Sequence, residues 1–144
     1  MQRQLQYWQQ KLDAAPALVL PTDFPRPRQQ SFVGAAVDRE LPTETCDRLR
    51  EFNASQGCTL FMTLLTGFQA LLSRFSGQTD FVVGSPIANR NRTEIEGLVG
   101  FFVNSLALRC DLTDDPSFLE ATARGRELAW LQDRRAPGQC RVPR

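Results

Sequence analysis

Residues 59–85, which read TLFMTLLTGFQALLSRFSGQTDFVVGS, hold the strongest secondary-structure signal in the 144-residue chain. Thr59 is suited to cap a helix whose apolar residues recur every three or four positions as far as Phe75, and Ser76-Gly77 can end it. Asp80 to Ser85 then reads as a buried strand. So wide an apolar face is typical of a core helix, and we expect it to be buried; its members are Leu60, Phe61, Leu64, Leu65, Phe68, Leu71, Leu72 and Phe75.

The segments that precede this stretch predict two helices, a linker and a strand. Residues 2–12 place apolar side chains at helical spacing. Four prolines make residues 14–30 an extended linker, because proline disrupts both helix interiors and central strands. Residues 31–41 alternate loosely and predict a strand with a turn or bulge near Gly34. Residues 42–57 predict a second helix, which ends at a glycine.

The segments that follow it predict a loop, a strand and a helix. Residues 87–96 are polar and loop-like, whereas residues 105–112 alternate as a half-buried strand does. A further helix is expected from Pro116. The order indicates an α/β fold with a three-stranded sheet, and so small a sheet normally needs more strands or a partner. We expect the aromatic residues to be core residues and not a cofactor site; they are Phe61, Phe68, Phe75, Phe101 and Phe102.

Composition excludes several classes of protein. With 42% hydrophobic and 23% charged residues, the chain is typical of a globular protein. Its net charge of +1 provides no general attraction to nucleic acid or to anionic membranes. The longest apolar stretch is too short to span a bilayer, and the N-terminus lacks the apolar run of a secretory signal. We therefore expect a cytoplasmic protein with neither nucleic acid nor a membrane as a partner.

The chain contains no histidine. This removes the commonest general base, the Ser-His-Asp arrangement and most transition-metal sites. Ser85 lacks both an activating base and the strand-turn-helix context of a nucleophilic serine. The cysteines have no CxxC spacing, so we expect free thiols and no metal site; they are Cys46, Cys58, Cys110 and Cys140.

Three stretches carry recognisable motifs. QLQYWQQKL at 4–12 is followed by LPTDFPRP at 20–27, DFVVGSPIANR spans 80–90, and GLVGFFVNSLALR spans 97–109. In order and spacing, these stretches resemble the condensation domains of nonribosomal peptide synthetases. The first is similar to the helix and proline-rich crossing between that family's two lobes, and the third to its motif (I)GxFVNTxxxR. The resemblance extends from about Gln4 to about Arg126.

The resemblance implies a fold and a role. The fold is a two-lobed pseudodimer of the chloramphenicol acetyltransferase type, in which each lobe is an α/β sandwich. Residues 1–30 would be the inter-lobe helix and crossing, and residues 31–126 part of the C-terminal lobe. In the full enzyme a carrier-bound acyl or peptidyl thioester is joined to a carrier-bound aminoacyl amine. The implied partners are carrier protein domains and the N-terminal lobe; no cofactor is bound directly, since the substrates travel on the carriers' phosphopantetheine.

The family's catalytic motif HHxxxDG is absent, so no residue here is assigned a catalytic role and we expect the chain alone to be inactive. The downstream motifs HQDxPFE and RDxSRNP are absent too, and residues 127–144 are expected to be a divergent tail. A frameshift is one hypothesis: codons GCA-CCA-GGA-CAG for residues 136–139, read one base later, encode His-Gln-Asp. Sequencing of the locus tests it.

The resemblance also implies candidate site residues. Asn104 either faces the substrate channel, where an amide can both donate and accept hydrogen bonds, or makes a strand-edge hydrogen bond. Ser105 lies beside it in the channel set, and Gly100 either belongs to that set or supplies a permissive backbone conformation. Arg109 is expected to form a structural bidentate pair with a carboxylate. The loop residues Asn89, Arg90 and Arg92 either contact the phosphopantetheine phosphate or are solvated.

Two alternative functions remain open. The chain could be a noncatalytic module that docks a carrier protein or complements a separately encoded N-terminal lobe. Within the parent family, epimerisation or heterocyclisation is also open, because the deciding motifs mostly lie outside these residues. In either case an uncovered lobe interface should leave an apolar patch that promotes aggregation of the isolated chain.

Overall fold

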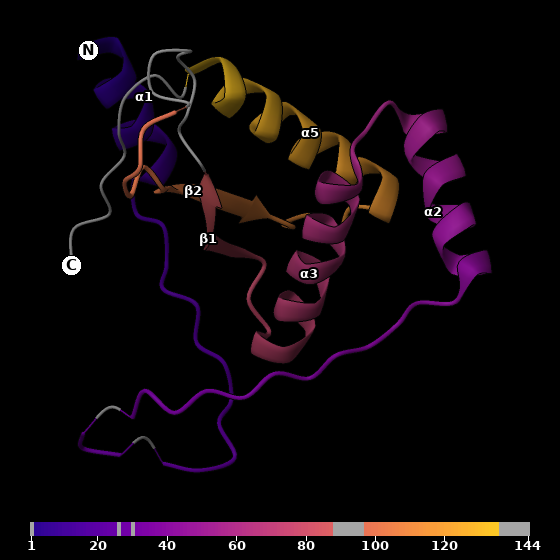
Figure 1. The fold of residues 1–144 in the computed structure, drawn as a ribbon. Helices are drawn as coiled ribbons and strands as arrows, with labels where there is room; N and C mark the ends of the chain where they lie inside the picture. The colour runs from indigo at the N-terminus through magenta and orange to yellow at the C-terminus, as the bar shows by residue number, and fades with distance from the viewer. Residues whose placement is uncertain (1, 26, 30, 88–96, 136–144) are drawn as a thin grey trace.

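The computed structural model describes residues 2–25, 27–29, 31–87 and 97–135 (Figure 1). α3 packs against both α2 and α5, and α5 also packs against β2. The linker between α1 and α2 loops away from the helices and the strands (Figure 1). The elements in chain order are α1 Gln2–Leu12, α2 Thr43–Gln56, α3 Leu60–Ser76, β1 Asp80–Ile87, β2 Asn104–Asp111 and α5 Phe118–Arg135.

The predicted helix boundaries in the middle of the chain are confirmed, and the capping residues explain them. The Thr59 hydroxyl accepts a hydrogen bond from the Met62 backbone N–H and so caps the start of α3. Gly57 ends α2 and Gly77 ends α3, with φ angles of 59° and 70°. Both angles lie in the left-handed region, which glycine adopts without steric cost.

The two strands form an antiparallel ladder whose register places Asp80 opposite Asp111 and Ile87 opposite Asn104. Residues directly opposite one another share a face of the ladder. One face therefore carries Phe81 beside Cys110, and both are fully or almost fully buried. They form a core cluster with Leu72 of α3. The predicted strands at 80–85 and 105–112 are confirmed to within two residues.

The prediction of a third strand is wrong. Residues 31–41 run without regular structure and pair with no other part of the described chain. Their large apolar side chains are 58–93% exposed. A strand is stabilised by its ladder partner, and alternation in the sequence cannot supply one. The exposed side chains are Phe32, Val33, Val37 and Leu41.

The predicted orientation of α3 is also wrong. Its buried residues are Leu72 and three polar residues, Thr63, Thr66 and Gln69. Leu65 is half-buried, but six of the eight residues expected in the core are 48–64% exposed. We call these six the α3 apolar face: Leu60, Phe61, Leu64, Phe68, Leu71 and Phe75. Of the other core aromatics, Phe101 is exposed and Phe102 is half-buried.

The polar side of α3 can be buried because its hydroxyls are satisfied and its neighbour is small. Thr66 donates to the Met62 carbonyl oxygen at 2.9 Å, and Thr63 donates to the Asn53 side-chain oxygen at 2.5 Å. A Cβ atom at Gly125 would lie 3.4 Å from the Thr66 hydroxyl, so the glycine lets α5 approach α3 closely. The apolar side of α3 has no comparable cover in the described part of the chain.

The described ranges were also searched for membrane spans and metal sites. They contain no single helix that is long and apolar enough to cross a membrane; α2 and α3 reach that length only together, and they are bent by 104°. These ranges hold no cluster of three or more potential metal ligands. Cys46, Cys58 and Cys110 are free thiols, while Cys140 lies outside the described residues.

Two adjacent leucines of α3 test its orientation. Leu72 is 9% exposed and Leu71 is 50% exposed. In monomeric protein at low concentration, Leu72→Ala should lower the free energy of unfolding by about 2–3 kcal/mol, because it removes core contacts. Leu71→Ala should cost about 1 kcal/mol or less. Urea denaturation followed by circular dichroism measures both, and a larger loss for Leu71→Ala would contradict the described packing.

Candidate functional site

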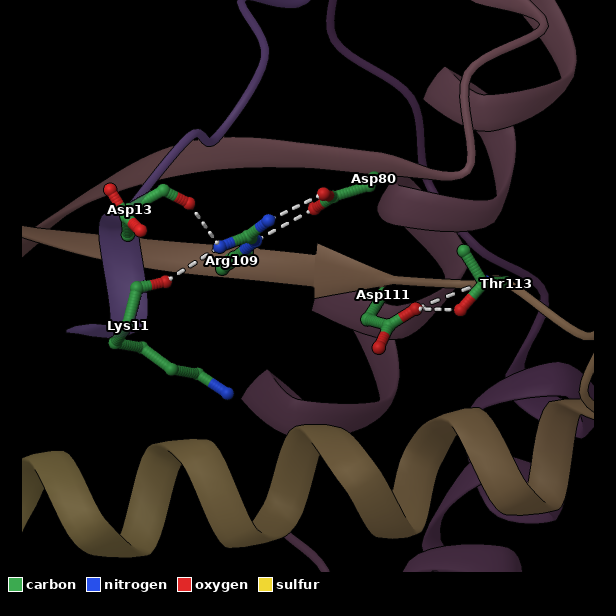
Figure 2. Close-up of polar contacts among 6 residues, drawn as sticks. All are labelled: Lys11, Asp13, Asp80, Arg109, Asp111 and Thr113. Carbon is green, nitrogen blue, oxygen red and sulfur yellow. Dashed lines mark hydrogen bonds and ion pairs between the residues drawn. The ribbon is translucent and has the colours of Figure 1, made fainter.

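A single guanidinium group joins three segments of the chain (Figure 2). Arg109 of β2 donates from Nε and Nη2 to the two carboxylate oxygens of Asp80 on β1, at 2.8 and 2.6 Å. Its Nη1 donates to the backbone carbonyl oxygens of Lys11 and Asp13, each at 3.0 Å. Arg109 thus ties both strands to the end of α1.

Local structure explains how these groups meet. The register places Arg109 opposite Val82, and Asp80 lies two residues away on the same face, which is a diagonal within reach of a long side chain. α1 ends at Leu12, and the last carbonyl groups of a helix have no partner within the helix. A cation at that end is favoured by both hydrogen bonding and the helix dipole.

The pair remains charged over the physiological range. Hydrogen bonds from Arg109 hold the pKa of Asp80 below its ordinary value of 3.8, although burial acts in the opposite direction. The same hydrogen bonds raise the pKa of Arg109. The two side chains are 22% and 28% exposed, so the pair is well shielded from water without being sealed from it. These groups hold the structure together and do not exchange protons near neutral pH.

A cleft of about 560 Å³ lies beside this pair. Its lining comes from four elements and includes Lys11 of α1, Gln69 of α3, Asp111 of β2 and Arg124 of α5. The volume falls within the range of pockets that hold a small molecule or a short chain segment. It is the larger of the two cavities found within the described residues.

The polar groups of the cleft offer no general base or nucleophile. Asp111 accepts hydrogen bonds from the hydroxyl and the backbone N–H of Thr113 (Figure 2), which lower its pKa. Arg124 donates to the backbone carbonyl oxygens of Asp111 and Thr113. Burial raises the pKa of the Cys110 thiol to about 12, so it stays protonated and unreactive. The described groups can bind and orient but are unsuited to proton transfer.

The sequence-derived channel residues Asn104 and Ser105 lie at the other end of the ladder from Arg109. Asn104 begins β2, opposite Ile87, and is half-buried; its side-chain oxygen accepts a hydrogen bond from the Ser105 backbone N–H. Five residues of strand separate Asn104 from Arg109, or about 17 Å at the usual rise. Neither Asn104 nor Ser105 lines the cleft.

The remaining sequence-derived residues fall into two groups. Gly100 is exposed and its backbone is not in the left-handed region, so it is not needed for an unusual conformation. A Cβ atom there would lie 3.2 Å from a ring carbon of Phe102, so close approach explains the glycine better. Asn89, Arg90 and Arg92 lie outside the described residues.

Sequence reasoning missed several residues that the structure brings together. It expected a carboxylate partner for Arg109 but did not identify Asp80, and it assigned no role to Asp111, Gln69 or Lys11. The only local signal was the placement of aspartates at the start of one strand and the end of the other. Their meeting depends on strand register, and the role of Lys11 depends on its backbone carbonyl, which no side-chain pattern reveals.

Removal of the guanidinium charge should have a pH-dependent effect. Arg109→Gln should lower the free energy of unfolding by about 1–3 kcal/mol at neutral pH, since it breaks a shielded charge pair. Because the folded-state pKa of Asp80 is depressed, the pair contributes fully above the unfolded value of about 3.8 and is lost as pH falls through the folded value. The difference between wild type and variant should therefore shrink from pH 7 to about pH 3.

Arg50→Gln is the matched control. Arg50 pairs with Asp47 at 2.6 Å on the surface of α2, where both side chains are largely exposed. Such pairs contribute at most about 1 kcal/mol, so this variant should change stability little at either pH. Urea unfolding of both variants at the two pH values measures the effect. Equal losses for Arg109→Gln and Arg50→Gln would rule out the structural role of Arg109.

Comparisons with known proteins agree with this architecture. The X-domain from teicoplanin biosynthesis, solved alone and in complex with OxyB, superimposes with a TM-score of 0.85 at 28% identity, and the match covers 92–93% of this chain and 30% of the X-domain chain. The four-domain nonribosomal peptide synthetase holo-AB3403, bound to AMP and glycine, gives a TM-score of 0.85 at 26% identity over 92% of this chain and 10% of that chain.

Sequence comparison is more specific. A linear gramicidin synthase from Brevibacillus parabrevis is 51% identical over 130 residues, which are 90% of this chain but only 2% of that protein. The chain therefore spans a small part of the relatives that it matches. The family described as the condensation domain matches residues 1–132. The chain belongs to the condensation domain family of nonribosomal peptide synthetases, of which it represents part of one domain.

Proposed function

We propose that this chain forms one wall of the channel of a condensation domain, within the C-terminal lobe of a two-lobed, chloramphenicol acetyltransferase-like enzyme. In the complete domain, an acyl or peptidyl thioester on one carrier protein is transferred to the amine of an aminoacyl group on another. The phosphopantetheine arms of the carriers deliver both substrates, and this chain supplies no catalytic base. We place the complete protein in the cytoplasm.

One observation carries the proposal. Residues 1–132 match the condensation domain family, yet the chain covers only about 30% of the solved X-domain of the same fold. The described site agrees with a partial, positioning role, because its carboxylates are ionised and its buried thiol is protonated. With no histidine in the sequence, the proton transfer of amide formation must come from another part of the domain.

The ladder suggests which end of the chain meets the substrates. Because β1 ends at Ile87 and β2 begins at Asn104, opposite it, the connecting loop emerges at the Asn104 end. That loop contains Asn89, Arg90 and Arg92, whose donors suit a phosphate. In the proposal, Asn104 and Ser105 line the channel and the loop contacts phosphopantetheine, while the Arg109 end lies away from the channel.

A second function is favoured by a separate observation. The teicoplanin X-domain, which shares this fold, is solved in complex with OxyB. A domain of this architecture can therefore act as a docking surface for a protein partner. The alternative for the present chain is a noncatalytic module that binds a carrier protein or complements a separately encoded lobe.

A graft separates the two functions. Residues 1–132 of this chain would replace the matched region of the linear gramicidin synthase, and formation of that enzyme's peptide product would be measured with its carriers loaded. We expect product from the graft and none from the isolated chain, because only the graft restores a complete domain. A folded graft that binds loaded carriers but forms no product would favour the docking module.

Asn104 gives a sharper test within the same graft. Asn104→Ala should reduce the rate of product formation about 10-fold or more, since it removes a hydrogen-bonding group from the channel, worth roughly 1.4 kcal/mol per factor of ten. In the isolated chain the same change should alter stability by less than about 0.5 kcal/mol, because the Asn104 side chain bonds only its neighbour. Unchanged product formation would remove Asn104 from the channel.

A further inference from the structure

The side chain of Gln69 is buried without a partner. It projects from the middle of α3, is only 6% exposed, and makes no side-chain hydrogen bond to any other described residue. Its amide atoms are nevertheless not sealed, because no fully buried side-chain nitrogen or oxygen among the described residues lacks a hydrogen bond. Since Gln69 lines the cleft beside Arg109, that cleft is the natural route by which its amide remains accessible.

Another glutamine in this chain shows what such an amide can bind. The side-chain oxygen of Gln78 accepts from the Val19 backbone N–H at 2.7 Å, and its side-chain nitrogen donates to the Ala17 backbone carbonyl at 3.0 Å. One side-chain amide thereby satisfies two backbone groups of an extended segment. Gln69 has the same donor and acceptor, aimed into a cleft of about 560 Å³.

The charges around the cleft favour a neutral backbone over a small ion. Lys11 and Arg124 bring positive charge, Asp111 brings negative charge, and Arg109 is neutralised by Asp80. Arg124 and Asp111 are already engaged with neighbouring backbone groups. No side of the cleft therefore presents an excess of one sign that would select a phosphate or an ammonium group.

We propose that this cleft binds an extended polypeptide segment from the part of the condensation domain outside this chain, with the Gln69 amide paired to the backbone of that segment. The inference rests on the proposed function, because it requires a complete domain. The solved X-domain of this fold is covered only to 30% by this chain, so most of such a domain is available to supply the segment. An unpaired buried amide then becomes a docking contact between two parts of one domain.

The test is a reversal of sign between two contexts. In the isolated chain, Gln69→Leu should raise the melting temperature by about 2–5 °C, because it removes an unpaired polar group from the interior. For the complete domain, the graft into the linear gramicidin synthase would be excised to the length of the solved X-domain. There the same change should lower the melting temperature by a similar amount, since it breaks a pair.

Gln78→Leu is the matched control. Its partners, Ala17 and Val19, lie within the chain, so this variant should lower the melting temperature in both contexts. Stabilisation by Gln69→Leu in both contexts, or destabilisation in both, would overturn the proposal. These outcomes are separate from failure of the proposed function, which is read from product formation in the graft without either substitution.

A second measurement covers a graft that does not fold. Overlapping synthetic peptides from the part of the same synthase that flanks the matched region would be added to the isolated chain. We expect one peptide to bind, to shift the side-chain amide resonance of Gln69, and to lose at least 10-fold in affinity for the Gln69→Leu variant. Failure of every peptide to bind, or equal binding to the variant, would overturn the proposal.

Discussion

The arrangement of this chain depends on the Arg109 guanidinium. Its planar set of N–H donors meets both oxygens of Asp80 and two backbone carbonyl groups at the end of α1. Lysine could not reproduce this arrangement, because an ammonium group lacks the rigid fork. α1 supplies one wall of the cleft, so the same group that closes the strand ladder also determines where that cleft lies. The interaction is thus a matter of assembly and not of catalysis.

Local signals in the sequence predicted most of the elements. Thr59 and Gly57 marked helix ends through backbone requirements that apply in any fold, and the two paired strands were recognised from their apolar residues. The failures were non-local. Residues 31–41 alternate as a strand does, but a strand exists only beside a partner, and the described chain provides none. The α3 apolar face shows the same limit: a pattern identifies the surface that needs cover without showing whether the cover belongs to the same chain.

The candidate site was predicted only in part, for a related reason. Asn104 and Arg109 belong to one sequence motif, yet β2 carries them to opposite ends of the ladder. A motif read as letters suggests one site, whereas its extended backbone serves two places. Arg109 was expected to pair with a carboxylate, but Asp80 as its partner followed only from strand register. The roles of the Lys11 and Asp13 carbonyls could not be predicted from side chains, since every residue has a carbonyl group.

The contacts of Arg109 also have a consequence for the order in which the molecule assembles. Its bonds to the carbonyl groups of Lys11 and Asp13 join residues 98 and 96 positions apart. An 11-residue helix is marginal in water, so α1 has little stability until that contact forms. At about 5–20 residues per second, the ribosome needs roughly 5–20 s to reach Arg109 after it has completed α1. The first helix to be synthesised is therefore among the last to be placed.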